Sequence, residues 1–189
     1  MKACLSLSEN LPIQYRVKNF TKKNLRTIEG NWETIKESLS TTVRLISHFG
    51  FTAKNVVVPL ALLPIAFYIM KCGNSSFDTS ASADDADAQV AIRKWFIFST
   101  LKNAFGGSSD TTLTRLRELL KSCSPTTPFP ADNLYKSLSI EPRFDDAEID
   151  LRAPNKTPLQ AASLPPRMAA RASLFGVLSI KLVKCLVLC

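Results

Sequence analysis

A run of 16 uncharged residues, 55–70, constrains the fold of this chain more than any other segment. A membrane-spanning helix needs about 20 apolar residues, and this run is shorter and contains Pro59 and Pro64. Pro59 is expected to separate a short turn from a helix over 60–71. Pro64 then falls near the first turn of that helix, where its missing N–H costs least. Because the helix is apolar nearly all round, we expect it to be the buried centre of a soluble bundle.

Periodic apolar residues predict helices on both sides of this central one. Over 31–49 they recur at spacings of three and four, which places them on one face of a helix. Asn31 is a plausible cap for its beginning, and Gly50 can take the left-handed conformation that ends it. A third long helix is expected over 87–105, where the Gly-Gly pair at 106 and 107 stops it.

The remaining helices are shorter and more polar. Ser109 or Asp110 is expected to cap a helix whose leucines point inward, and another short helix is expected over 131–138. The outer face of the former should carry three cations: Arg115, Arg117 and Lys121. The loop over 73–88 is small, polar and acidic, and one of three aspartates should cap the helix after it: Asp84, Asp85 or Asp87. Four aromatic residues are expected in the core: Trp32, Tyr68, Trp95 and Phe96.

These elements predict an all-α fold, a bundle of four to six helices with an irregular N-terminal arm and a loosely ordered C-terminal tail. Three regions follow from composition. Residues 1–30 form a basic arm or linker, residues 31–150 the helical domain, and residues 151–189 a proline-rich linker and apolar tail.

The sequence offers no candidate catalytic, cofactor-binding or metal-binding residues. The five cysteines contain no Cys-x-x-Cys pair, and His48 is the only histidine, so a zinc site is not expected. We interpret the cysteines as reduced thiols in a cytoplasmic protein. Asp145 and Asp146 are adjacent, which on a helix places them about 100° apart and not on one face, as an acid–base pair would need.

Positive charge is concentrated near the beginning of the chain. Residues 1–60 carry nine Lys and Arg against four Glu, a net charge of +5. Five of these cations fall within eleven residues: Arg16, Lys18, Lys22, Lys23 and Arg26. Tyr15 and Phe20 are interleaved with them. Cations can neutralise phosphates while aromatic rings stack on unpaired bases, so these five are the candidate nucleic-acid-binding residues; a solvated arm is the other interpretation.

The order of segments downstream resembles the helical region of GmrSD-type restriction proteins. The matching pieces are "SHFGFT", "NVVVPLALLPIAFYIMK", "AIRKWFIFSTLKNAFGGSSDTTLTRLRE" and "FPADNLYKSL", within residues 30–150. The Phe-Gly-Gly-Ser-Ser-Asp junction is the most specific of them. The family comprises large bacterial nucleases, related to ParB-like NTP-dependent nucleases, some of which attack modified phage DNA.

The resemblance implies a structural part of such a protein and not its active site. The family's Asp-Gly-Gln-Gln-Arg motif and its C-terminal His-x-x-Pro signature have no counterpart here. The family would continue with a further helix after "FDDAEID", whereas this chain has four prolines over 154–166. A truncated or frame-shifted gene is one hypothesis for that departure.

Three functions remain open from the sequence. The first is a non-catalytic helical domain or fragment of a modification-dependent restriction protein in phage defence, scaffolding or DNA-associated, whose partners are DNA and a nuclease domain absent from this chain. The second is a stand-alone nucleic-acid-binding module that uses the basic arm. The third is a membrane-associated protein, although no membrane partner is expected. Apolar surface meant for a missing partner would predict self-association.

Overall fold

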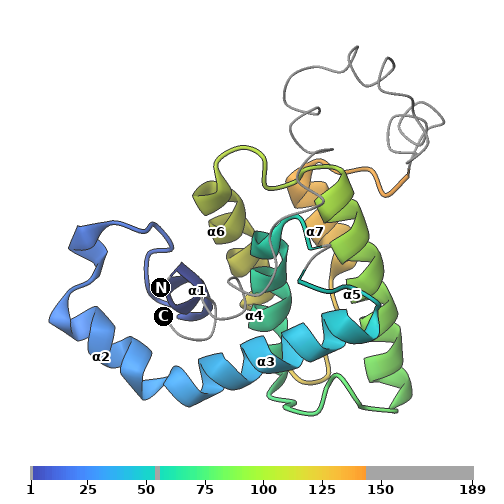
Figure 1. The fold of residues 1–189 in the computed structure, drawn as a ribbon, viewed down its shortest axis with the longest axis horizontal. Helices are drawn as coiled ribbons and strands as arrows, with labels where there is room; N and C mark the ends of the chain where they lie inside the picture. Colours follow the sequence, from blue (N-terminus) through green and yellow to red (C-terminus); the bar gives the residue numbers. More distant parts are fainter. Residues whose placement is uncertain (1, 54–55, 144–189) are drawn as a thin grey trace.

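The computed structural model describes residues 2–53 and 56–143 (Figure 1). This part of the chain contains helices and no strand, so the predicted all-α fold is confirmed. Its elements, in chain order, are α1 (Lys2–Leu7), η1 (Val17–Asn19), α2 (Lys22–Gly30), α3 (Trp32–His48), η2 (Pro59–Ala61), α4 (Leu62–Cys72), α5 (Ala83–Leu101), α6 (Ser109–Leu120) and α7 (Ala131–Leu138). The predictions for the tail after residue 151, and for Asp145 and Asp146, lie outside the described residues.

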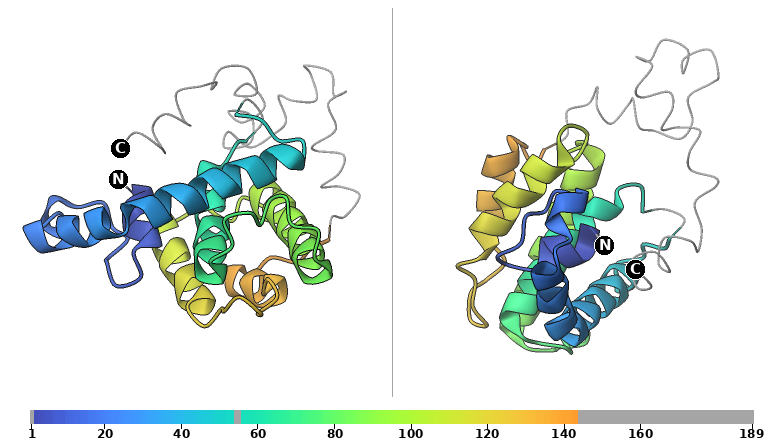
Figure 2. Two further views of the ribbon diagram at one scale, coloured as in Figure 1. Left: turned by 90° about the horizontal axis from the view of Figure 1, so that it is seen from below. Right: turned by 90° about the vertical axis from the view of Figure 1, so that its left-hand side faces the viewer.

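Helix α4 is the centre of the bundle, as its composition predicts. Nine of its 11 residues are buried, and it packs against α1, α3 and α6. Figure 2 shows it surrounded by the other bundle helices. Pro59 begins the short 3-10 turn η2, and Pro64 is the third residue of α4, where no helical hydrogen bond is lost. Gly73, with φ of 64°, ends the helix in the left-handed conformation that glycine adopts without strain.

Helix α3 begins and ends within one residue of the predicted bounds. Gly50 has φ of 86°, and the Phe51 N–H donates to the Ile46 carbonyl at 3.1 Å, which closes the helix as expected. Asn31 does not cap α3 through its side chain. Its Nδ2 donates instead to the Thr27 carbonyl at 2.9 Å, because Asn31 also ends α2 and satisfies one of that helix's free carbonyls.

Helix α5 begins and ends about four residues earlier than predicted. Its cap is Ser82, whose hydroxyl accepts from the Asp85 N–H at 3.2 Å, so the assignment of the cap to an aspartate is wrong. The helix ends at Leu101, before the glycines. Gly106 belongs to the following turn, where a Cβ would run into the side chain of Asn103, itself at φ of 60°.

The first residues are not an irregular arm throughout. Helix α1 is buried from Ala3 to Leu7, and α2 is a regular helix. Short apolar segments such as this give little periodicity, which is why the sequence did not reveal α1. Arg117 holds the segment in place, so its predicted outward position is wrong.

Arg117 is 8% exposed, and its Nη1 lies 3.2, 3.0 and 2.7 Å from the carbonyl oxygens of Leu5, Ser8 and Leu11. The Leu5 carbonyl belongs to the last turn of α1, where helix geometry leaves carbonyls without partners, whereas the Ser8 carbonyl also accepts from the Leu11 N–H at 3.2 Å. The guanidinium supplies the missing donors. Burial lowers the pKa of Arg117 from its usual value.

Two apolar clusters hold the described residues together. The larger, which we call the bundle core, contains Tyr68, Trp95 and Phe96, as predicted. Edge-to-face ring contacts cross it, with Phe129 5.1 Å from Tyr68 and 6.0 Å from Trp95. Trp32 is only partly buried and packs against a separate second cluster, made of Cys4, Leu5, Leu11 and Ile28.

Candidate nucleic-acid interface

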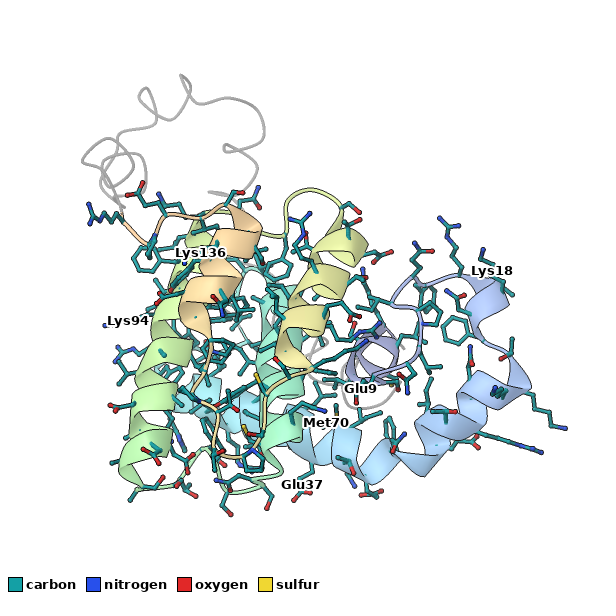
Figure 3. The ribbon with its side chains drawn as sticks, turned by 180° about the vertical axis from the view of Figure 1, so that it is seen from behind. Glu9, Lys18, Glu37, Met70, Lys94 and Lys136 are labelled. Carbon is teal, nitrogen blue, oxygen red and sulfur yellow. The ribbon has the colours of Figure 1, made fainter. Side chains whose placement is uncertain are left out.

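Residues 14–31, which contain η1 and α2, form a basic protrusion at one end of the molecule. Figure 1 shows η1 and α2 at the edge away from α5 and α7. In Figure 3, Lys18 lies at the far end of the protrusion, opposite Lys94 of α5 and Lys136 of α7. The second cluster supports the base of the protrusion, through Ile28 of α2 and the partly buried Phe20.

All five predicted binding residues lie on this protrusion and are exposed. Arg16 and Lys18 belong to the η1 turn, while the other three lie in the first half of α2. Glu29 is the one acidic residue between 14 and 31, so five cations and one anion give the protrusion a net charge of +4. Among the described residues, ion pairs form at Lys2, Lys36, Arg44, Lys71, Lys121 and Arg143, and none is found at these five cations.

The positions of the cations in α2 destabilise the helix locally. Lys22 and Lys23 stand in its first turn, which carries no acidic residue, although the N-terminal end of a helix favours negative charge. Lys22 and Arg26 are four residues apart, a spacing at which like charges repel. An anion bound beside these residues would relieve both effects, since it would interact favourably with the side chains and the helix end together.

Hydrogen bonds brace the chain between η1 and α2. The Thr21 hydroxyl caps α2 by accepting from the Asn24 N–H at 3.2 Å. The Asn24 side chain donates to the Asn19 carbonyl at 2.8 Å, and buried Asn19 donates to the Gln14 carbonyl at 2.6 Å. The cations therefore extend from a backbone of fixed shape. Residue spacing alone does not mark these asparagines, and the one signal in the sequence is their position around the Thr21 cap.

Exposed apolar side chains accompany the cations. Tyr15 is 63% exposed, Val17 is 92% exposed and Leu25 is 36% exposed. The rings of Tyr15 and Phe20 meet edge to face, with centroids 5.3 Å apart and planes at 67°. Phe20 packs against the second cluster, so one ring of the pair is anchored and the other faces solvent.

Groups that carry out acid–base or metal chemistry do not gather at this site. Within residues 2–53 and 56–143, no three His, Cys, Asp or Glu side chains are placed to hold a metal ion. His48 is distant in sequence, at the end of α3, with Nδ1 3.2 Å from the Asp78 carbonyl oxygen. Asp78 accepts from Arg44, and that hydrogen bond holds the pKa of the carboxyl below its usual value. Both contacts tie the loop before α5 to α3.

The chemistry of the protrusion suits a polyanionic partner. It presents exposed cations, a fixed backbone and one aromatic ring, a combination typical of surfaces that bind nucleic acid without reading its sequence.

Comparison of the sequence with protein-family models gave no match, and comparison with curated proteins gave none either. Over the described residues, each helix is too short or too polar to cross a lipid bilayer.

Proposed function

We propose that this chain is a non-catalytic helical domain that associates with nucleic acid through its basic protrusion. The observation that carries the proposal is the set of five exposed cations without ion-pair partners among the described residues, on a protrusion with a single acid. Each cation that contacts a phosphate releases a condensed counterion, so the binding free energy comes largely from the entropy of those ions.

We further propose that the domain derives from a restriction-type protein that acts in phage defence. The segments that resemble that family lie between the end of α3 and α7 and include α4, the second half of α5 and most of α6, and the basic protrusion precedes all of them. In this view the bundle is the scaffold that couples to a nuclease domain outside this chain, and the protrusion is the part that touches DNA. The chain alone should then show no nuclease turnover with Mg²⁺ and a nucleoside triphosphate.

The proposed function is tested by DNA binding as a function of salt. The variant Lys22→Ala/Lys23→Ala/Arg26→Ala removes three charges from the protrusion. Arg93→Ala/Lys94→Ala/Lys136→Ala is a matched control, since it removes the same three charges from exposed positions of α5 and α7. Binding of the full chain to a fluorescent 20-nucleotide strand is measured by anisotropy between 50 and 200 mM KCl.

Each lost phosphate contact should lower the slope of log affinity against log salt by about one. We therefore expect the protrusion variant to lose about two to three in slope, and the bundle control to keep the slope of the unmodified chain. Equal losses in the two variants would mean that net charge alone drives binding. An unchanged slope in the protrusion variant would remove the basis of the proposal.

A further inference from the structure

We infer that the basic protrusion prefers unpaired nucleic acid over duplex, with the ring of Tyr15 as the surface on which a base stacks. The inference rests on the proposed function, because it assumes that the neighbouring cations contact phosphates. It adds the form of the nucleic acid and the residue that selects it.

The first support is the way the ring of Tyr15 is presented. Phe20 contacts it edge to face, and Phe20 is itself packed against the second cluster, as Trp32 is. An edge-to-face contact fixes the orientation of a ring and leaves much of its surface open. Tyr15 is 63% exposed, so its surface is available to a flat partner.

The second support is the neighbourhood of that ring. Arg16 follows Tyr15 directly, and Lys18 is three residues away, so two exposed cations neighbour the aromatic ring along the chain. Val17 between them is 92% exposed, which leaves an apolar side chain in water unless a partner covers it. A strand whose phosphates lie along the cations would bring its bases to these two side chains.

The third support is rigidity. The hydrogen bonds of Asn19 and Asn24 fix the turn between η1 and α2. A surface held in its binding conformation loses little entropy on association. The phosphates of duplex and single strand are both accessible to the cations, but the faces of the bases are accessible only when the bases are unpaired.

An anionic membrane also combines negative charge with apolar groups, so it is the alternative partner for the protrusion. The geometry of α2 argues against membrane binding. A helix that lies on a bilayer turns an apolar face to the lipid. Helix α2 buries Ile28 toward the second cluster and exposes lysines and an arginine, with Leu25 the one apolar side chain on its outer surface. Helix α2 therefore presents cations for the phosphates of nucleic acid and lacks the apolar face that would enter the acyl chains of a bilayer.

The experiment compares three forms of one 20-nucleotide DNA: the single strand, its duplex, and a strand of the same length with abasic sites. The full chain is measured with Tyr15→Ala and Tyr15→Phe, and Val90→Ala serves as a control for loss of an exposed apolar side chain on α5. Because Tyr15 is exposed, these variants should fold, which far-UV circular dichroism checks.

Stacking on an aromatic side chain contributes about 1–3 kcal/mol per base, which corresponds to a factor of about 5 to 150 in affinity. Tyr15→Ala should weaken binding to the single strand by such a factor and leave duplex binding within about twofold. Tyr15→Phe should retain the preference, and Val90→Ala should change neither. The abasic strand should bind the unmodified chain as weakly as the normal strand binds Tyr15→Ala.

Two results would overturn the inference. In one, single strand and duplex bind equally and Tyr15→Ala changes neither, while the loss of Lys22, Lys23 and Arg26 still weakens both; the proposed function would then stand without the preference. In the other, vesicles of phosphatidylcholine with about one third phosphatidylserine bind the chain through Tyr15 and DNA does not bind, which would reject the proposed function as well.

Discussion

The bundle and the basic protrusion both contain α-helices, but they differ in how many residues are buried and in how many charged side chains face water. The bundle core contains 30 buried residues and is crossed by edge-to-face aromatic pairs. The second cluster beneath the protrusion contains four buried residues, while the cations of the protrusion face water. The free energy of folding grows with buried apolar area, so we expect the bundle to contribute most of it. Local unfolding of the protrusion should therefore need less free energy than unfolding of the bundle. The candidate site therefore lies on the region that we expect to be less stable.

The two tryptophans of the chain allow the sharpest test of this difference. Trp95 is fully buried in the bundle core, and Trp32 is partly buried against the second cluster. Trp95→Ala should lower the free energy of unfolding by about 3–5 kcal/mol, because it leaves a large cavity among packed rings. Trp32→Ala should lower it by about 1–2 kcal/mol, since less surface leaves contact. Urea denaturation followed by far-UV circular dichroism measures both, and equal losses would contradict the contrast.

Arg117 connects α6 of the bundle to the segment before the protrusion and provides the next largest effect. Arg117→Met keeps the unbranched apolar part of the side chain but removes the guanidinium, which donates to three carbonyls of the first segment. We expect a loss of about 2–3 kcal/mol, because unpaired buried carbonyls are costly. Hydrogen exchange should accelerate most over residues 2–13.

The control for that prediction is Arg115→Met on the same helix. Arg115 is exposed and donates to the Ser137 carbonyl at 2.8 Å, so its loss should change stability by no more than about 0.5 kcal/mol. If Arg117→Met changed exchange uniformly along the chain, the first segment would not be a separately held unit.

The contrast between the two regions also explains which helices can be predicted from the sequence alone. Long periodic segments with proline or glycine at their ends, such as α3 and α4, could be predicted almost to the residue because local geometry and burial point to the same answer. Residues 2–13 could not, because six helical residues have too few turns to show a period. Arg117 lies four residues after Leu113 and three before Leu120, which is the spacing of the buried face of α6. Because Arg is charged, it was expected on the outer face in spite of that spacing.

For the candidate site, the sequence predicted which cations are exposed but not how they are held. The exposure of all five follows from charge and from the absence of nearby apolar periodicity. The hydrogen bonds of Asn19 and Asn24 and the anchoring of Phe20 depend on contacts across a turn, which residue spacing does not specify. The interleaved Tyr15 and Phe20 suggest stacking on unpaired bases from the sequence alone, but which ring is anchored and which is exposed depends on the three-dimensional arrangement.

Within the bundle, Asp78 tests how much a polar contact adds to apolar packing. Its buried carboxylate accepts from Arg44 Nε at 2.8 Å and from Nη2 at 3.2 Å. Because Arg44 is half exposed, solvent screens the pair, and we expect Asp78→Asn to lose about 1–2 kcal/mol at neutral pH. Asp84→Asn, at an exposed position of the first turn of α5, is the control and should change little.

The pH dependence of this pair has a definite sign. Arg44 holds the pKa of Asp78 below the usual 3.8. A carboxyl with a lowered pKa in the folded state stabilises the fold above its unfolded pKa, and that contribution disappears as pH falls through the folded pKa. The difference in stability between the unmodified chain and Asp78→Asn should therefore be constant above about pH 5 and shrink below pH 4. If the difference in stability between the two proteins persisted into strong acid, the shape of the Asp78 side chain, and not its charge, would hold the loop before α5.

The smallest effect is expected from a single hydroxyl inside the bundle core. The Tyr68 hydroxyl donates to the Thr127 carbonyl at 2.8 Å and joins α4 to the segment after α6. The Tyr135 hydroxyl is also buried but finds no acceptor within the described part of the chain. Tyr68→Phe should cost about 1 kcal/mol, whereas Tyr135→Phe should cost nothing measurable, since no hydrogen bond is lost.

Alkaline pH tests the burial of the two tyrosine hydroxyls. Burial raises the pKa of both hydroxyls above the usual 10, that of Tyr135 to about 12. A raised pKa means that the neutral form is favoured in the folded state, so the contribution to stability is complete below pH 10 and is lost as pH rises through the folded pKa. Each Phe variant should therefore lose less stability than the unmodified chain between pH 10 and 12. If the Tyr135→Phe and unmodified curves coincided there, the Tyr135 hydroxyl would be reached by water, and the dry interior that distinguishes the bundle from the basic protrusion would be smaller than the structure indicates.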